Sequence, residues 1–199
     1  MSHIYITPFL LQAIAFVYYK QGFWDRAVRT FNESLNIRLK QQNPDSGDIA
    51  VVLHNIAAVY LEMGETDKAI KFYEQTLFHE YNAPNKEGID VVRTLQCLAQ
   101  LYQMNDDLDI ALKCYEEAVE YSCQNISEKE TSIQVSRLYS YIGNIHIQKG
   151  DTDKAIEAYV IALSLNRHCV GIDDCSIIIS DGLALYEVLR EQGEAAAAA

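Results

Sequence analysis

Residues that interrupt helices are scarce in this chain. Its 199 residues include only 9 Gly and 3 Pro. All-β and loop-rich folds use both residues far more heavily, so their scarcity favours an all-α fold. Hydrophobic residues make up 49% and charged residues 22%, which is the balance of a folded globular protein. The length fits one ordinary domain or one short array of repeats.

Positive charge is also scarce. Sixteen Lys and Arg stand against 28 Asp and Glu, which gives a net charge of −12. A field of that sign repels phosphate backbones and anionic membrane surfaces, so we expect no nucleic acid partner. The apolar stretch 4–19 lacks a basic leader and a small-residue cleavage site, and it is too short to span a bilayer comfortably. We therefore expect no membrane insertion.

Paired cysteines and catalytic motifs are missing as well. The five cysteines form no CxxC pair, and an odd number indicates reduced thiols in an intracellular, cytoplasmic compartment. His168, Cys169 and Cys175 offer too few ligands at irregular spacing for a metal site. The sequence contains no glycine-rich phosphate loop, no HExxH and no nucleophile elbow. We expect no enzyme activity, no cofactor and no metal.

What the chain does contain is an internal repeat. Residues 64–70, GETDKAI, recur 86 residues later as 150–156, GDTDKAI. Related copies lie between and before them, at 106–112 and 22–28. One alanine anchors each copy, and the spacings between these alanines are 42, 42 and 44 residues: Ala27, Ala69, Ala111 and Ala155. A repeat of this length predicts an array of supersecondary units.

Four further columns accompany the alanines. An aromatic residue follows each by four positions: Phe31, Tyr73, Tyr115 and Tyr159. An earlier segment holds a large ring in each copy, at Tyr18, Tyr60, Tyr102 and His146. Small residues lie three positions before these rings, at Ala15, Ala57, Ala99 and Gly143, each preceded by Ile or Leu. Spacings of three and four residues predict helices, so His146 is expected in the core rather than in catalysis.

The columns predict a helix hairpin in each copy. Gly22, Gly64, Asp106 and Gly150 fall where the first helix must end in a left-handed residue. Asp and Thr just beyond are expected to cap the second helix and to suit its positive end. The small residues of the first helix should face the alanines of the second, so that the two backbones approach closely.

This pattern resembles the tetratricopeptide repeat family, and the 42-residue spacing is most similar to the kinesin light chain type. The resemblance implies an all-α, right-handed α-solenoid of about four and a half hairpin repeats. We expect one array over 1–193, with repeats at 7–47, 48–89, 90–132 and 133–175 and a partial copy at 176–193. Residues 194–199 carry no packing information.

The resemblance also implies a non-catalytic scaffold or adaptor that binds a protein or peptide partner in a concave groove lined by the first helices. Arg93 and Arg137 hold the same inner position in adjacent copies and would bind carboxylates, which predicts an extended, partly acidic peptide. The alternative is that both arginines pair with acids of their own chain. The groove candidates are His54, Asn55, Arg93, Gln96, Gln100, Arg137, Tyr141 and Asn144.

The sequence allows two other interpretations. The carboxylate clamp of family members that bind chaperone C-termini would fall on Gln12, Phe16, Asn55, Arg93 and Cys97. Only Asn55 matches that clamp. Arg93 is a different basic residue at a basic position of the clamp, and the other three residues do not match, so no clamp is expected. The second is a structural subunit of a larger assembly that contacts its partners through repeat ends and the convex surface. The apolar start and the incomplete fifth copy favour it.

Overall fold

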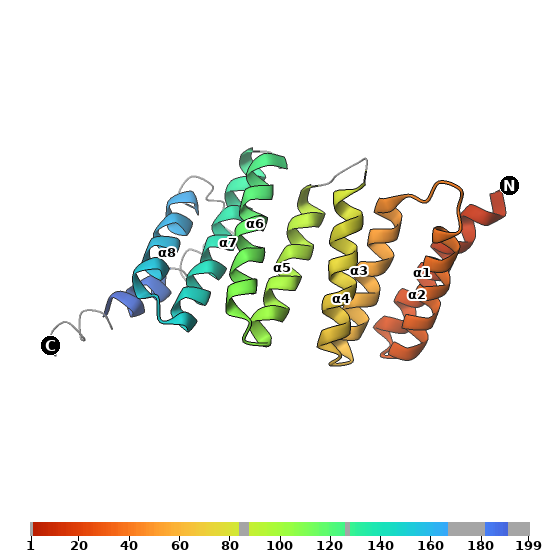
Figure 1. Ribbon diagram of the computed structural model, residues 1–199, viewed down its shortest axis with the longest axis horizontal. Coiled ribbons are helices and arrows are strands. Elements are labelled where there is room, and N and C mark those ends of the chain that lie inside the picture. Colours follow the sequence, from red (N-terminus) through yellow and green to blue (C-terminus); the bar gives the residue numbers. More distant parts are fainter. Residues whose placement is uncertain (1, 84–87, 126–127, 167–181, 191–199) are drawn as a thin grey trace. The chain divides into compact units, whose positions relative to one another are not determined.

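The computed structural model describes residues 2–83, 88–125, 128–166 and 182–190, and α-helices are the only regular structure in these ranges. The all-α class expected from the sequence is confirmed. The helices labelled in Figure 1 are α1 (Ser2–Lys20), α2 (Trp24–Leu39), α3 (Ser46–Glu62), α4 (Thr66–Tyr81), α5 (Gly88–Met104), α6 (Leu108–Asn125), α7 (Glu128–Lys149) and α8 (Thr152–Asn166). Residues 182–190 form one more.

The chain divides into two compact units, Met1–Leu98 and Ala99–Ala199. In the first unit α1 packs on α2, α2 on α3, and α3 on α4. In the second unit α6 packs on α7, and α7 on α8. In each of these pairs, helices that follow one another in the sequence are neighbours in space, as a stack of hairpins requires.

The turns inside the hairpins have the predicted left-handed residue. The φ angles are 76° at Gly22, 75° at Gly64, 65° at Asp106 and 78° at Gly150. In each turn the next amide donates to the carbonyl five residues before it, at 2.9 Å in all four copies. This is the hydrogen bond of a Schellman helix end, which satisfies a carbonyl that the helix leaves open. One column of the sequence therefore sets where every first helix ends.

The predicted side-chain caps are absent from the second helices α2 and α4. The residues that precede α2 and α4 are Phe23 and Glu65, and neither makes a side-chain cap hydrogen bond. The left-handed turn leads directly into the helix, so Thr66 already lies in the first turn of α4. The expected favourable charge is present, because Asp25 and Asp67 lie in the first turns of α2 and α4.

Both columns of small residues are buried. The alanines are 0% exposed on the first helices, at Ala15, Ala57 and Ala99, and on the second helices, at Ala27, Ala69, Ala111 and Ala155. Gly143 is the one glycine in these columns, and a Cβ there would lie 2.9 Å from the ring of Tyr159. Real Cβ contacts are never that short, so this position excludes any larger residue.

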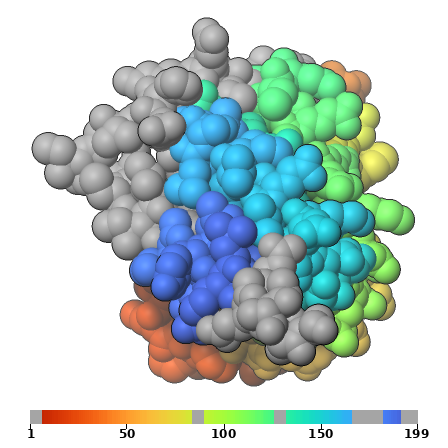
Figure 2. All heavy atoms as spheres, turned by 90° about the vertical axis from the view of Figure 1, so that its left-hand side faces the viewer, coloured from red at the N-terminus to blue at the C-terminus, as the bar shows by residue number. Residues whose placement is uncertain are grey.

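The aromatic columns fill the core beside the alanines. The exposed fractions of Phe31, Tyr73, Tyr115 and Tyr159 are at most 2%, and His146 is also buried. In the first unit Phe31 joins a cluster that includes residues of α1, α2 and α3. In the second unit Val188 packs on Ala155 and Tyr159, and Figure 2 shows residues 182–190 in blue beside α8.

Several expectations fall outside the described residues. His168, Cys169, Cys175 and the tail 194–199 lie there, and the repeat boundaries stay predictions. Within the described ranges no group of three or more His, Cys, Asp and Glu could hold a metal ion. No helix in those same ranges combines the length and the apolar character that crossing a membrane requires.

Candidate functional site

The structure brings together three of the eight groove candidates. His54 and Asn55 on α3 and Arg93 on α5 line one pocket of about 340 Å³ in the first unit. The lining of this pocket also includes Glu80 of α4 and Asp90 of α5. We call it the α3–α5 pocket. Gln96 lies on the same part of α5, while the remaining candidates belong to the second unit.

Arg93 is engaged within its own helix. Its guanidinium forms an ion pair with Asp90, three residues earlier on α5. For Arg93 this is the alternative given above, in which the arginine pairs with an acidic residue of its own chain. The Arg93 side chain is 58% exposed, and exposed pairs of this kind contribute about 0–1 kcal/mol, so the pair is easily exchanged for another one.

Glu80 is the residue of this pocket that sequence reasoning missed. It is only 8% exposed, and the Thr94 hydroxyl donates to its Oε1 at 3.1 Å. Its Oε2 is buried and accepts no hydrogen bond from the described residues. Burial raises the pKa of the Glu80 carboxyl to about 7, although the Thr94 hydrogen bond acts in the opposite direction. The available signal was its position, eleven residues after Ala69 on a packed helix face.

His54 is a neutral ring in the lining of the pocket. Its ring meets Tyr73 edge-on, with centroids 5.1 Å apart. Burial lowers the pKa of His54 to about 4, and the charge of Arg93 lowers it further. Its Nδ1 is buried without a hydrogen bond to the described residues. A neutral imidazole has one accepting nitrogen, so His54 can add an acceptor to this wall.

A second pocket of about 560 Å³ lies on the other side of α3, between α1 and α3. We call it the α1–α3 pocket. Its lining is largely apolar and includes Phe9, Phe16 and Val51, whose exposed fractions are 56%, 47% and 49%. Val51 and Asn55 line both pockets. The first helices of this unit therefore present one surface that is apolar beside α1 and polar beside α5.

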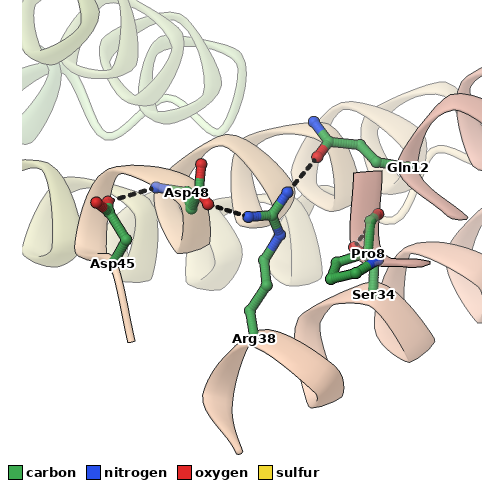
Figure 3. A network of polar contacts seen from close by, with 6 residues as sticks. All are labelled: Pro8, Gln12, Ser34, Arg38, Asp45 and Asp48. Atoms are coloured by element: carbon green, nitrogen blue, oxygen red, sulfur yellow. Dashed lines mark hydrogen bonds and ion pairs between the residues drawn. The ribbon is translucent and has the colours of Figure 1, made fainter. Parts of the chain in front are cut away.

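A buried cation lies beside the α1–α3 pocket (Figure 3). Arg38 of α2 is 2% exposed, and its guanidinium forms an ion pair with Asp48 of α3. The same group donates to Gln12 Oε1 of α1 at 3.1 Å and stacks over the Phe9 ring at 4.4 Å from its centroid. Arg38 thus joins the acceptors of two successive first helices.

The candidates of the second unit have mainly structural contacts. Tyr141 is stacked on the buried Tyr115, with ring centroids 5.3 Å apart and planes 22° apart. Asn144 Oδ1 accepts a hydrogen bond of 2.6 Å from the Tyr159 hydroxyl. Arg137 is half-buried on α7, and Gln100 is exposed on α5. Tyr141 joins α7 to α6 of the preceding hairpin, Asn144 joins α7 to α8, and all four residues stay candidates.

These observations define the class of protein: an array of helix hairpins that recur every 42 to 44 residues, each ended inside by a left-handed turn and packed through buried alanines. The chain belongs to the tetratricopeptide repeat family, which it matches over residues 8–77 and 90–168. A comparison with curated protein sequences found no match.

Solved structures agree with this assignment. The chain is similar to BtubC (BKLC) from P. vanneervenii, with a TM-score of 0.77 and 21% identity over 92% of this chain and 72% of that one. It is also similar to TPR-like repeats of a Podosopora anserina protein described as a kinesin light chain, with a TM-score of 0.70 and 16% identity over 92% and 86% of the two chains. The chain is similar as well to the apo form of RapI, with a TM-score of 0.80 and 14% identity over 94% of this chain and 49% of that one. The expected solenoid fold class and the kinesin-light-chain-like repeat type are confirmed.

Proposed function

We propose that this protein is a non-catalytic interaction scaffold that binds an extended segment of a partner protein across α1, α3 and α5. The observation that carries the proposal is the pair of pockets that share Val51 and Asn55. A peptide that crosses α3 would place one side chain in each pocket, which is how extended ligands gain specificity. Tetratricopeptide repeats are used for protein interaction. The two adjoining pockets support this surface as the place where the chain would bind its partner.

The two pockets favour different side chains. Phe9, Phe16 and Val51 offer apolar surface to an aliphatic or aromatic residue of the peptide. The polar wall across α3 offers hydrogen-bonding groups to the neighbouring residue and to the peptide backbone. The acidic character expected for the peptide rests on Arg93 and Arg137. Since Asp90 already engages Arg93, this part stays a prediction to be tested with peptides of either charge.

The test is selection of binders from a library of random linear peptides, followed by affinity measurement on the intact chain. A Val51→Trp variant would fill the space between the two pockets, and we expect it to weaken binding about tenfold or more, which is 1.4 kcal/mol. Val160→Trp is the matched control, because Val160 on α8 is 50% exposed and lines neither of these pockets. Failure to select any peptide, or equal affinity of both variants, would overturn the proposal.

A structural subunit is the second candidate, and exposed apolar side chains favour it. Phe9, Leu10 and Val17 of α1 are each more than half exposed, and so are Leu183 and Tyr186 of the 182–190 helix. Native mass spectrometry after affinity purification separates the candidates. A constant stoichiometric complex supports the subunit, whereas an uncomplexed chain that takes up selected peptides supports the scaffold.

Cys97, Cys114 and Cys123 are thiols, which supports a reducing, cytoplasmic location for either role.

A further inference from the structure

Two successive contacts between repeats differ at one decisive position. Arg38 and Glu80 each lie eleven residues after the alanine that anchors their copy, Ala27 and Ala69. Both side chains are buried on the second helix, where it meets the first helix of the next copy. The first contact therefore encloses a cation, and the equivalent place in the second contact encloses a carboxyl group.

The groups around this position are retained. Asp48 and Asp90 are 42 residues apart and lie in the first turns of α3 and α5. Gln12 and His54 are also 42 residues apart, and both can accept a hydrogen bond. In the first contact the Arg38 guanidinium binds both Asp48 and Gln12. In the second contact the acid and the acceptor remain, while the chain supplies no buried cation from α4.

The α3–α5 pocket lies at this altered position. Glu80 Oε2 and His54 Nδ1 are buried without hydrogen bonds to the described residues. Buried acceptors without a donor are unfavourable, so this wall favours a ligand that brings donors. Arg93 pairs with Asp90 but is more than half exposed, and it does not replace the buried guanidinium.

We propose that the α3–α5 pocket binds a basic side chain of the partner peptide, whose cationic group donates to Glu80 and takes the place that Arg38 fills in the preceding contact. Arginine is favoured over lysine, because its planar fork presents several donors at once to acceptors on different helices. The inference rests on the proposed function, since it names the residue that the same surface takes. The pocket lining carries the two acidic residues Glu80 and Asp90 against the single cation Arg93, so its charge favours a basic group over a carboxylate.

The first experiment uses peptides selected on the intact chain. Each basic residue is replaced in turn, arginine by citrulline, which keeps the shape and removes the charge. We expect one replacement to weaken binding to the wild-type chain about tenfold, as loss of a charge-assisted hydrogen bond would. The same replacement should have almost no effect on a Glu80→Gln variant. Selected peptides without a basic residue, or a citrulline effect of equal size on both proteins, would overturn the inference and leave the scaffold intact.

The second experiment needs no peptide. Nα-acetyl-L-arginine amide is titrated against the chain while NMR signals of His54 and Asn55 are followed, with Nα-acetyl-L-glutamine amide as the neutral probe. We expect weak binding, in the millimolar range typical of a small fragment, for the arginine probe alone. Glu80→Gln should abolish it. Glu33→Gln, which removes the same charge from an exposed position on α2, should leave it unchanged.

A third variant covers the case in which Glu80→Gln perturbs the fold. Glu80→Arg rebuilds the arrangement around Arg38 and should close the site to the arginine probe while keeping a cooperative unfolding transition. If the arginine and glutamine probes shift the His54 signal equally, the inference fails. If the arginine probe binds but no peptide is selected, the pocket assignment stands and the scaffold proposal fails.

Discussion

Arg38 and Asp48 form an ion pair whose two members differ sharply in burial: the Arg38 side chain is 3% exposed and the Asp48 side chain 41%. Removing the acid leaves a buried guanidinium without its charge partner, whereas removing the arginine takes the buried charge away. The two ends of this pair should therefore differ in their effect on stability.

We predict that Asp48→Asn lowers the free energy of unfolding by about 1–3 kcal/mol and that Arg38→Met lowers it less. Urea unfolding followed by circular dichroism measures both. Asp67→Asn removes a carboxylate from the first turn of α4 and reports the helix-dipole contribution alone, about 0.3–1 kcal/mol. An Arg38→Met variant that is at least as destabilised as Asp48→Asn would contradict this account.

Glu80 should make stability fall as the pH rises. The folded protein holds the pKa of this carboxyl at about 7, above its ordinary value of 4.5, so the folded state binds more protons between these limits. Stability from this group is present below pH 4.5 and is lost as the pH rises to 7. Glu80→Gln should then stabilise the protein by about 1–3 kcal/mol at pH 8 and by little at pH 5. Thermal unfolding at both pH values gives the comparison, and an equal effect at each would refute it.

Binding of the arginine probe should depend on pH in the opposite sense. The carboxylate form of Glu80 is needed, so affinity at pH 6 should be about tenfold weaker than at pH 8. Across this range His54 on α3 stays neutral, since its pKa is about 4, and burial raises the pKa of the Cys97 thiol on α5. The other charged groups that line this pocket are Asp90 and Arg93 of α5. Titrations at several pH values with Glu80→Gln as control measure the effect, and a flat profile for the wild type would exclude Glu80 as the titrating group.

Gly143 should not tolerate a methyl group. Gly143→Ala places a carbon against the Tyr159 ring, which is itself fixed by its bond to Asn144. We expect a loss of about 1–3 kcal/mol in unfolding free energy, typical of overpacking. Gly182→Ala is the matched control, because no atom lies within 4 Å of a Cβ there, and it should be neutral or slightly stabilising. Equal melting temperatures for the two variants would disprove the close contact.

A glycine at the left-handed position of the third turn should raise the stability of the protein. Asp106 has a φ of 65°, while Gly64 holds the equivalent place in the second turn. Asp106→Gly should raise the unfolding free energy by about 0.5–1 kcal/mol, and Gly64→Ala should lower it by about 1 kcal/mol. Urea midpoints decide this, and a destabilised Asp106→Gly would show that the Asp side chain stabilises the turn.

Much of the fold could be predicted because its determinants are local and repeat along the chain. A left-handed Gly or Asp every 42 to 44 residues marks a helix end, and an alanine column must be buried wherever two backbones approach. The capping prediction failed at α2 and α4 because the left-handed turn brings Phe23 and Glu65 to the start of these helices. The repeating columns alone do not show this. Residue spacing gives the hairpin, but the direction in which the chain leaves a turn depends on its dihedral angles.

The candidate site was only partly predictable. His54, Asn55 and Arg93 lie in one pocket because all three belong to first helices that line it. Glu80 was missed because a Glu on a second helix reads as a solvated residue, and only tertiary packing buries it. Tyr141 and Asn144 have the spacing of groove residues, yet rings from neighbouring helices engage both. Spacing along one helix cannot reveal what a neighbouring helix contributes.

The residue eleven places after each of the first three anchoring alanines differs in charge from copy to copy. It is positive at Arg38, acidic at Glu80 and a neutral hydroxyl at Ser122, and all three are buried. The surrounding columns are nearly interchangeable, so this single site gives each junction its own electrostatic identity. If copies were shuffled or deleted, the new junction would bring together buried groups of mismatched charge. Such a chain should be less stable than the original one, even though each of its hairpins is unchanged.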